Sequence, residues 1–201
     1  MRGDLIMGRQ EKYDDVFFMK IIRPIITVLF KTLYTPKIIG TENIHLNDGI
    51  VLAGNHTSYF DCLLLISSVK RNIHFLAKDE LWKGPKKIIF SNLGLVPVNR
   101  RKKDGKSLEI AKKYLENDKV IGIFPEGTIG KNGLLPFKIG AVKMAYDTNS
   151  KIVPFSITGK YRLFSRDLKI VFHEPINIVG SDLEKENEKL RNIVMKEIGE
   201  K

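Results

Sequence analysis

The hydrophobic residues that follow Pro36 fall into short runs bounded by turn residues. Most of these runs are continuous rather than alternating, a pattern typical of strands whose two faces are both covered. The expected strands are Ile50–Ala53, Ile73–Ala77, Leu95–Val98, Val120–Phe124, Ile152–Ile157 and Ile170–His173.

Helical periodicity separates these runs, and Ser181 with Glu184 forms a capping box before the last helical stretch. The expected helices are Tyr59–Val69, Lys106–Leu115, Ile139–Asp147 and Leu183–Ile198. Strands that alternate with helices predict an α/β fold, with a mostly parallel central sheet flanked by helices and ligand-binding loops at the strand ends.

The segment Tyr13–Tyr34 is dense in large apolar residues, with Lys20, Arg23 and Lys31 among them. Pro24 predicts two short helical segments in place of one rod. Cations among apolar residues suit a helix in the headgroup region of a membrane, and a helix pair packed in the core is the alternative. We expect residues 1–35 to form an N-terminal interfacial segment and residues 36–201 a separate domain. The residues expected to contact the membrane are Phe17, Phe18, Ile21, Ile22, Ile25, Leu29 and Phe30.

Composition and charge narrow the class of protein. A chain of 201 residues with 43% hydrophobic and 28% charged residues is a folded globular protein of one domain, or of one domain with an appendage. Its single cysteine, Cys62, excludes a disulfide scaffold and favours a reducing, cytoplasmic location. The net charge of +11 predicts an anionic partner. No apolar stretch reaches the roughly 18 residues of a membrane-spanning helix.

His56 and Asp61 are the first candidates for chemistry, because they follow the predicted strand Ile50–Ala53 at the turn into a helix. The carboxylate of Asp61 would fix one imidazole nitrogen and leave the other as a base. His74 and Asp79 have the same spacing, but His74 lies inside an apolar run, where a core histidine is the ordinary interpretation.

Two further candidates follow strands. Glu126 comes after an apolar strand and Pro125, where open α/β sheets bind ligands, although an ordinary turn with a solvated glutamate fits the same pattern. Arg100 opens the basic run Arg100–Lys103 and carries a planar fork suited to phosphate.

Together these motifs resemble the glycerolipid acyltransferase family, and in particular its bacterial 1-acyl-sn-glycerol-3-phosphate acyltransferases. The resemblance rests on the order and spacing of Asn55–Asp61, Gly94–Arg100, Phe124–Thr128 and Ile152–Phe155. It implies that His56 is the general base and that Asp61 orients it.

The resemblance also implies roles for other residues of these motifs. Glu126, counted with the catalytic residues, would help to place the glycerol backbone, and Lys78 and Arg100 would bind the substrate phosphate. The remaining residues expected to bind substrate are Asn55, Gly127 and Thr128.

The implied reaction moves a fatty acyl group from a thioester to the 2-hydroxyl of 1-acyl-glycerol 3-phosphate and gives phosphatidic acid for phospholipid synthesis. Acyl-coenzyme A or acyl-acyl carrier protein would be the co-substrate, and no metal or other cofactor is expected. The expected location is the cytoplasmic face of the cell membrane, held peripherally on an anionic surface.

The chain departs from the family pattern at several positions. Ile129 and Gly130 follow Thr128, where the family usually has Arg-Ser, so either Lys131 or Lys138 compensates or the acceptor headgroup differs. Other open readings are an acyltransferase for a different lysolipid or glycerol phosphate, a non-catalytic basic lipid-binding protein, and a His/Asp metal hydrolase. Nucleic acid is not expected as a partner, because no aromatic platform accompanies the basic run.

Overall fold

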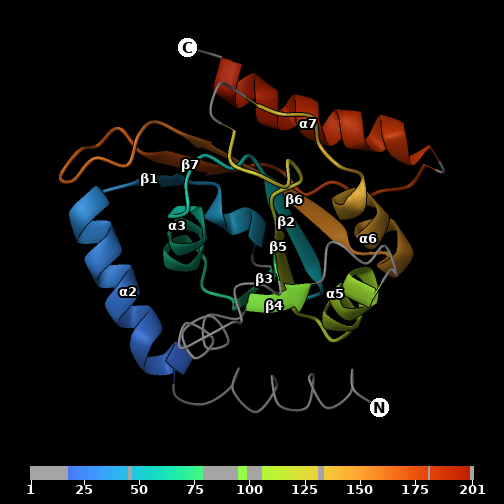
Figure 1. Cartoon of the computed structure of the whole chain (residues 1–201), viewed down its shortest axis with the longest axis horizontal. Helices are drawn as coiled ribbons and strands as arrows, with labels where there is room; N and C mark the ends of the chain where they lie inside the picture. The colour runs from blue at the N-terminus through green and yellow to red at the C-terminus, as the bar shows by residue number, and fades with distance from the viewer. Residues whose placement is uncertain are drawn as a thin grey trace.

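The structure is a computed structural model that describes residues 18–44, 47–78, 95–98, 106–130, 134–180 and 182–199. Its centre is a seven-stranded sheet in the order β1-β7-β6-β2-β5-β3-β4 (Figure 1). The strands are β1 (Lys37–Ile39), β2 (Ile50–Gly54), β3 (Ile73–Lys78), β4 (Leu95–Val98), β5 (Val120–Ile123), β6 (Lys151–Thr158) and β7 (Lys169–Phe172). Neighbouring strands are parallel except β6 and β7, which are antiparallel.

The predicted strands are confirmed, with ends that differ by a residue, and the sheet is mixed. The antiparallel pairing of β6 with β7 follows from their connection, residues 159–168, which is too short for the crossover helix that parallel neighbours require. β1 was not predicted, because three residues are too few to show the alternation or the apolar run of a strand.

The helices cover both faces of the sheet (Figure 1). They are α2 (Phe18–Tyr34), α3 (Asp61–Ser68), α5 (Lys106–Glu116), α6 (Gly140–Thr148) and α7 (Leu183–Gly199), with a short 3-10 helix, η1 (Thr41–Ile44). Every residue of β2 is buried: Ile50 and Leu52 belong to a hydrophobic cluster with α2 and α3, and Val51 and Ala53 to a second cluster with α5, α6 and α7. This alternation between two covered faces explains the continuous apolar run in the sequence.

α2 is a single helix with Pro24 inside it, so the prediction of two segments was wrong. Pro24 has no backbone N–H to donate, so one hydrogen bond of the helix is missing, but α2 continues through this position while it packs against α3. α2 lies against α3, and the guanidinium of Arg23 donates to the carbonyls of Val69 and Lys70 just beyond α3.

The two sides of α2 differ in burial. Phe30 is only 4% exposed and its ring packs against Tyr34 and Tyr161, so the prediction that it contacts lipid was wrong. Ile25 and Leu29 lie on the exposed side, at 50% and 56%. The predicted contacts of Phe17, Phe18, Ile21 and Ile22 fall outside the described residues or side chains. No helix in the described part of the chain has the length and apolarity to cross a membrane.

Asp182 caps α7. Its carboxylate accepts a hydrogen bond from the backbone N–H of Lys185 at 3.2 Å, the geometry of an N-cap. Ser181, the predicted cap, lies outside the described residues.

Candidate active site

His56 lies just beyond the C-terminal end of β2, a central strand of the sheet. Gly54 ends the strand, and a side chain there would lie 2.1 Å from the carbonyl oxygen of Phe155 on β6, so only glycine allows this approach. His56 then sits in the turn before α3, and Asp61 is the first residue of that helix. Their side chains meet, with Nδ1 of His56 2.8 Å from Oδ2 of Asp61, as the turn was expected to allow.

The Asp61 carboxylate is fully buried and has several donors besides the imidazole. The backbone N–H groups of Thr57 and Ser58 donate at 2.6 and 2.9 Å, and the Thr57 hydroxyl at 3.0 Å. The hydroxyl of Tyr161 donates at 2.5 Å. These charge-assisted bonds compensate for burial of the carboxylate. Because Asp61 can only accept, His56 carries its proton on Nδ1, which leaves Nε2 as the free base.

The imidazole ring is also held from its face. It stacks on Phe124 with ring centroids 4.1 Å apart and an angle of 15° between the planes. The His56 side chain is 17% exposed, so the stacked ring is still reachable from outside. A base fixed in this way needs little reorganisation before it accepts a proton.

Glu126 holds the backbone of this turn. The side chain is 5% exposed; Oε1 accepts from the His56 N–H at 2.6 Å and Oε2 from the Leu135 N–H at 2.8 Å. The Gly130 N–H also donates to the His56 carbonyl at 2.9 Å. Both carboxylate oxygens thus hold the protein backbone, which gives Glu126 a positioning role for the turn that carries His56. Its contact with the glycerol backbone stays a prediction.

Asn55 is likewise structural. The residue is 4% exposed, and its amide donates to the Ile157 carbonyl at 2.8 Å and accepts from the Ile157 N–H at 2.7 Å. The predicted contact with substrate is therefore corrected: Asn55 ties the end of β2 to β6, since its buried amide is used on both sides.

Gly127 and Thr128 lie on the turn after β5. Gly127 has a φ of +73°, and a Cβ there would lie 2.6 Å from Nζ of Lys138, so the Lys138 ammonium group sits beside the glycine. Thr128 is exposed. The side chain of Lys78 and all of Arg100 and Lys131 fall outside the described residues or side chains.

His74 is a core residue, as its apolar context predicted. It is 1% exposed and packs against the ring of Tyr114 at 4.4 Å. Burial lowers the pKa of His74 to about 4, so the ring is neutral at physiological pH. Asp79, its partner by spacing, lies outside the described residues.

Cys62 follows Asp61 but is poorly suited to be a nucleophile. Burial, with a smaller contribution from the Asp61 charge, raises the pKa of the thiol to about 12. We expect Cys62→Ser to keep the wild-type turnover if acyl transfer is direct, as the family resemblance implies. Initial rates and intact-protein mass after mixing with donor check this. An acylated Cys62 peptide together with an inactive serine variant would show covalent catalysis instead.

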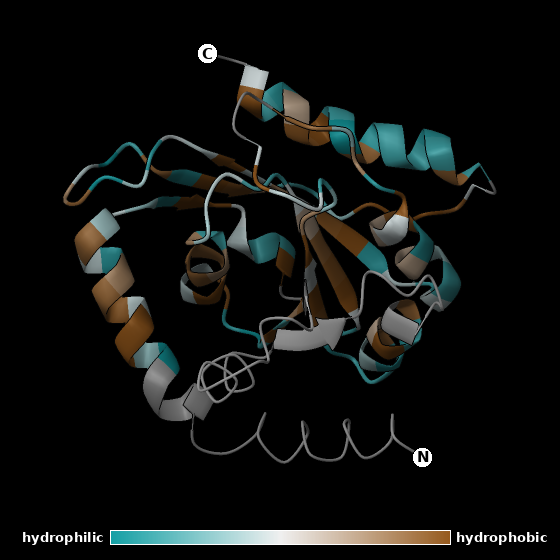
Figure 2. Cartoon of the chain, in the orientation of Figure 1, coloured by the Kyte–Doolittle hydropathy of each residue, from teal (hydrophilic) through white to brown (hydrophobic). Residues whose placement is uncertain are grey.

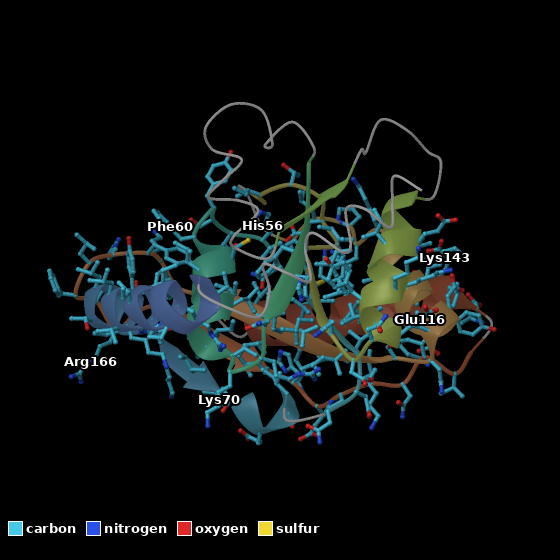
Figure 3. All side chains as sticks on the ribbon, turned by 90° about the horizontal axis from the view of Figure 1, so that it is seen from below. His56, Phe60, Lys70, Glu116, Lys143 and Arg166 are labelled. Carbon is cyan, nitrogen blue, oxygen red and sulfur yellow. The ribbon has the colours of Figure 1, made fainter. Side chains whose placement is uncertain are left out.

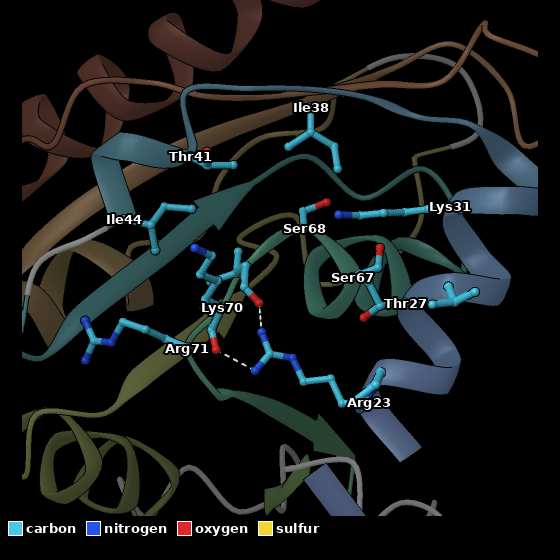
Figure 4. A pocket seen from close by; sticks show the side chains of 13 residues that line it. Arg23, Thr27, Lys31, Ile38, Thr41, Ile44, Ser67, Ser68, Lys70 and Arg71 are labelled. Carbon is cyan, nitrogen blue, oxygen red and sulfur yellow. Dashed lines mark hydrogen bonds between the residues drawn. The ribbon is translucent and has the colours of Figure 1, made fainter. Parts of the chain in front are cut away.

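A separate cavity of about 780 Å³ lies between α2 and the C-terminal end of α3 (Figure 4). Arg23, Lys31, Lys70 and Arg71 are among the residues that line it. His56 and Asp61 are at the other end of α3, so this cavity is not part of their site.

The chain is similar in sequence to known proteins. The acyltransferase family model matches residues 35–158. The 1-acyl-sn-glycerol-3-phosphate acyltransferase of Borreliella burgdorferi is 32% identical over 173 residues, which cover 81% of this chain and 69% of that protein. The chain belongs to the acyltransferase family. The enzyme of the same name from Bacillus subtilis is 30% identical over 150 residues, or 70% of this acyltransferase and 73% of the relative.

A solved structure shares the fold. The crystal structure of the 1-acyl-sn-glycerophosphate (LPA) acyltransferase of Thermotoga maritima superimposes with a TM-score of 0.70 at 22% identity, covering 99% of this chain and 88% of that one. This match confirms the α/β architecture, and the family model with the sequence relatives confirms the family resemblance.

Sequence reasoning missed part of the site of this acyltransferase. The backbone N–H and the hydroxyl of Thr57 both donate to the Asp61 carboxylate, four residues further on. Such local bonds from an aspartate side chain to nearby backbone are common in turns, so this contact could have been predicted. Phe124 belongs to the family motif Phe124–Thr128, but nothing in the sequence indicates that its ring stacks on His56. Tyr161 is a hundred positions from Asp61 in the sequence and gives no local signal.

Proposed function

We propose that this acyltransferase moves a fatty acyl group from a thioester to the 2-hydroxyl of 1-acyl-glycerol 3-phosphate and forms phosphatidic acid. One observation carries the chemistry: His56 and Asp61 form a fixed pair just beyond β2, and within the described residues the imidazole is hydrogen-bonded through Nδ1 alone. Relatives named for acylation of 1-acyl-sn-glycerol 3-phosphate support the choice of acceptor.

In the proposed reaction, Nε2 of His56 removes the proton of the acceptor hydroxyl while the oxygen attacks the thioester carbonyl. Asp61 stabilises the imidazolium that forms. Collapse of the tetrahedral intermediate breaks the carbon–sulfur bond, and the imidazolium returns the proton to the departing thiolate. A thiol with an ordinary pKa of about 8.5 leaves readily, so acyl-coenzyme A or acyl-acyl carrier protein suffices as co-substrate.

Lys138 is our candidate for the cation that the family pattern places after Thr128. Its ammonium group lies beside Gly127. Gly127 follows Glu126, whose carboxylate accepts a hydrogen bond from the backbone N–H of His56. A point charge there would attract the acceptor phosphate, together with Lys78 and Arg100.

We expect Lys138→Ala to raise the KM for 1-acyl-glycerol 3-phosphate by roughly tenfold or more and to leave kcat nearly unchanged, because the charge binds ground and transition states alike. Lys143→Ala is the matched control: this exposed lysine of α6 pairs with Asp147 and lies far from His56 (Figure 3). Steady-state kinetics on both variants check the prediction. An unchanged KM, or a loss confined to kcat, would contradict it.

We also propose that the enzyme works peripherally on the cytoplasmic, anionic surface of the membrane. Ile25, Val28 and Leu29 are 50%, 64% and 56% exposed and share one side of α2 by their spacing. The basic surplus of the chain favours an anionic surface.

One assay tests the proposed reaction directly. Purified protein is mixed with acyl-coenzyme A or acyl-acyl carrier protein and with glycerol 3-phosphate, 1-acyl-glycerol 3-phosphate or a neutral lysolipid in detergent. Mass spectrometry should find phosphatidic acid as the main product. A product formed only from glycerol 3-phosphate or from the neutral lysolipid would contradict the proposed acceptor, and absence of any acyl transfer would contradict the reaction.

A further inference from the structure

The connection between β6 and β7, residues 159–168, exposes large apolar side chains at its tip. Leu163 is 59% and Phe164 73% exposed. Figure 1 shows this connection at the side of the molecule where α2 lies, and Figure 2 shows its tip coloured as hydrophobic. Two large adjacent apolar side chains exposed on one surface need an explanation.

The tip is fixed to the end of α2. The Phe164 N–H donates to the Leu33 carbonyl at 2.6 Å, and the Thr35 hydroxyl donates to the Ser165 carbonyl at 2.7 Å. Phe164 has a backbone φ of +56°, in the left-handed region that residues other than glycine rarely adopt. The surrounding bonds hold the backbone in this conformation while the ring stays outside the core.

Cations surround the apolar tip. Lys160, Arg162 and Arg166 are exposed, and Asp167 is the acidic residue beside them. Apolar side chains flanked by Lys and Arg are the chemistry of a surface that inserts into lipid and binds anionic headgroups. The exposed apolar residues Ile25, Val28 and Leu29 belong to α2, the helix whose C-terminal end this tip contacts.

The same connection reaches inward to the reaction centre. Tyr161 packs on Phe30, Tyr34 and Phe60, and its hydroxyl donates to Asp61. The apolar tip is therefore joined to the carboxylate that orients His56 within a few residues of chain.

We propose that residues 160–166 form a second membrane-docking element, which places Leu163 and Phe164 in an anionic bilayer beside α2. This rests on the proposed membrane association. It adds that two elements far apart in the sequence contact lipid, and that the second sets the distance between the bilayer and the His56–Asp61 pair.

Insertion can be read directly by fluorescence. Trp82 is the single tryptophan of the chain, so Trp82→Phe with Phe164→Trp gives one reporter at the tip. Vesicles of phosphatidylglycerol with brominated acyl chains should quench it. The control carries Trp82→Phe with Val179→Trp, because Val179 is 85% exposed and precedes α7, whose N-terminal end lies across the molecule from α2 (Figure 1). Quenching at 164 but not at 179 supports the proposal, and equal or absent quenching overturns it.

The contribution to binding is measured with Leu163→Ser/Phe164→Asn. Asparagine tolerates the left-handed conformation at 164, so the anchored backbone is retained. We expect the partition coefficient onto phosphatidylglycerol vesicles to fall about tenfold or more, as two large apolar side chains are lost from the lipid interface. Val179→Ser should bind like wild type, and thermal unfolding checks that both variants fold.

The outcomes separate this inference from the function on which it rests. If wild type does not bind the vesicles, both membrane proposals fall, while the detergent assay still reports on acyl transfer. If wild type binds and the double variant binds equally well, only the second docking element is wrong. Self-association in sedimentation velocity that the double variant abolishes, without quenching at position 164, would assign the surface to a second copy of the chain instead.

Discussion

His56→Ala is expected to lower kcat by about 10²-fold or more, because general base catalysis contributes on the order of 10² to 10⁴. The acceptor hydroxyl then has to lose its proton to water, although the thioester and the headgroup still bind. Initial rates with saturating donor and acceptor measure the loss. The KM values should change much less than kcat, since Nε2 acts mainly in the transition state.

His173→Gln is the matched control for that variant. His173 is the other half-buried histidine of the described chain and accepts or donates a hydrogen bond with Ser156 at 2.8 Å, away from Asp61. Its loss should leave turnover unchanged. An alanine variant at position 56 that keeps the wild-type rate would remove the mechanism, whatever the control does.

Asp61→Asn is expected to lower kcat by about 10²- to 10⁴-fold and also to destabilise the fold. The amide has one acceptor oxygen and an NH₂ group that would face the donors now bound by the carboxylate. Either the imidazole takes the wrong tautomer or a backbone N–H of Thr57 or Ser58 loses its partner. Each buried donor left unpaired costs about 1–3 kcal/mol. Kinetics and thermal unfolding are measured on the same preparation.

Tyr161→Phe separates the two effects. It removes one donor to Asp61 and keeps the ring that packs on Phe30 and Tyr34. Burial, with the Asp61 charge next, raises the pKa of this phenol, so Tyr161 acts as a donor and not as an acid or base. The phenylalanine variant should lose far less turnover than Asp61→Asn. Equal losses would mean that Asp61 acts through the packing of this region and not through His56.

Sequence pattern was strongest where local order decides the outcome. The buried strand β2, the turn that carries His56 and the start of α3 lie within a short stretch, so the pairing of His56 with Asp61 could be read from the strand–turn–helix pattern. The core role of His74 followed in the same way from its apolar neighbours.

Predictions failed where burial depends on contacts between distant segments. α2 carries large apolar residues on more than one side in the sequence, and only its packing shows that Phe30 faces the core while Ile25 and Leu29 do not. The family resemblance gave Asn55 and Glu126 roles at the substrate, and it carries no information on their contacts within the fold. Their hydrogen bonds to Ile157 and Leu135 depend on how β6 and the segment after β5 fold back over the turn.

The sequence by itself determined the α/β class, the family and the pairing of His56 with Asp61, since hydrophobic period and motif spacing are properties of neighbouring residues. Only the tertiary structure decided which polar side chains hydrogen-bond to the backbone and which side of α2 is exposed. It also decided that the Tyr161 hydroxyl reaches Asp61. Those outcomes depend on contacts between residues far apart in the chain, and such contacts form only when the sheet order brings β2, β5 and β6 side by side.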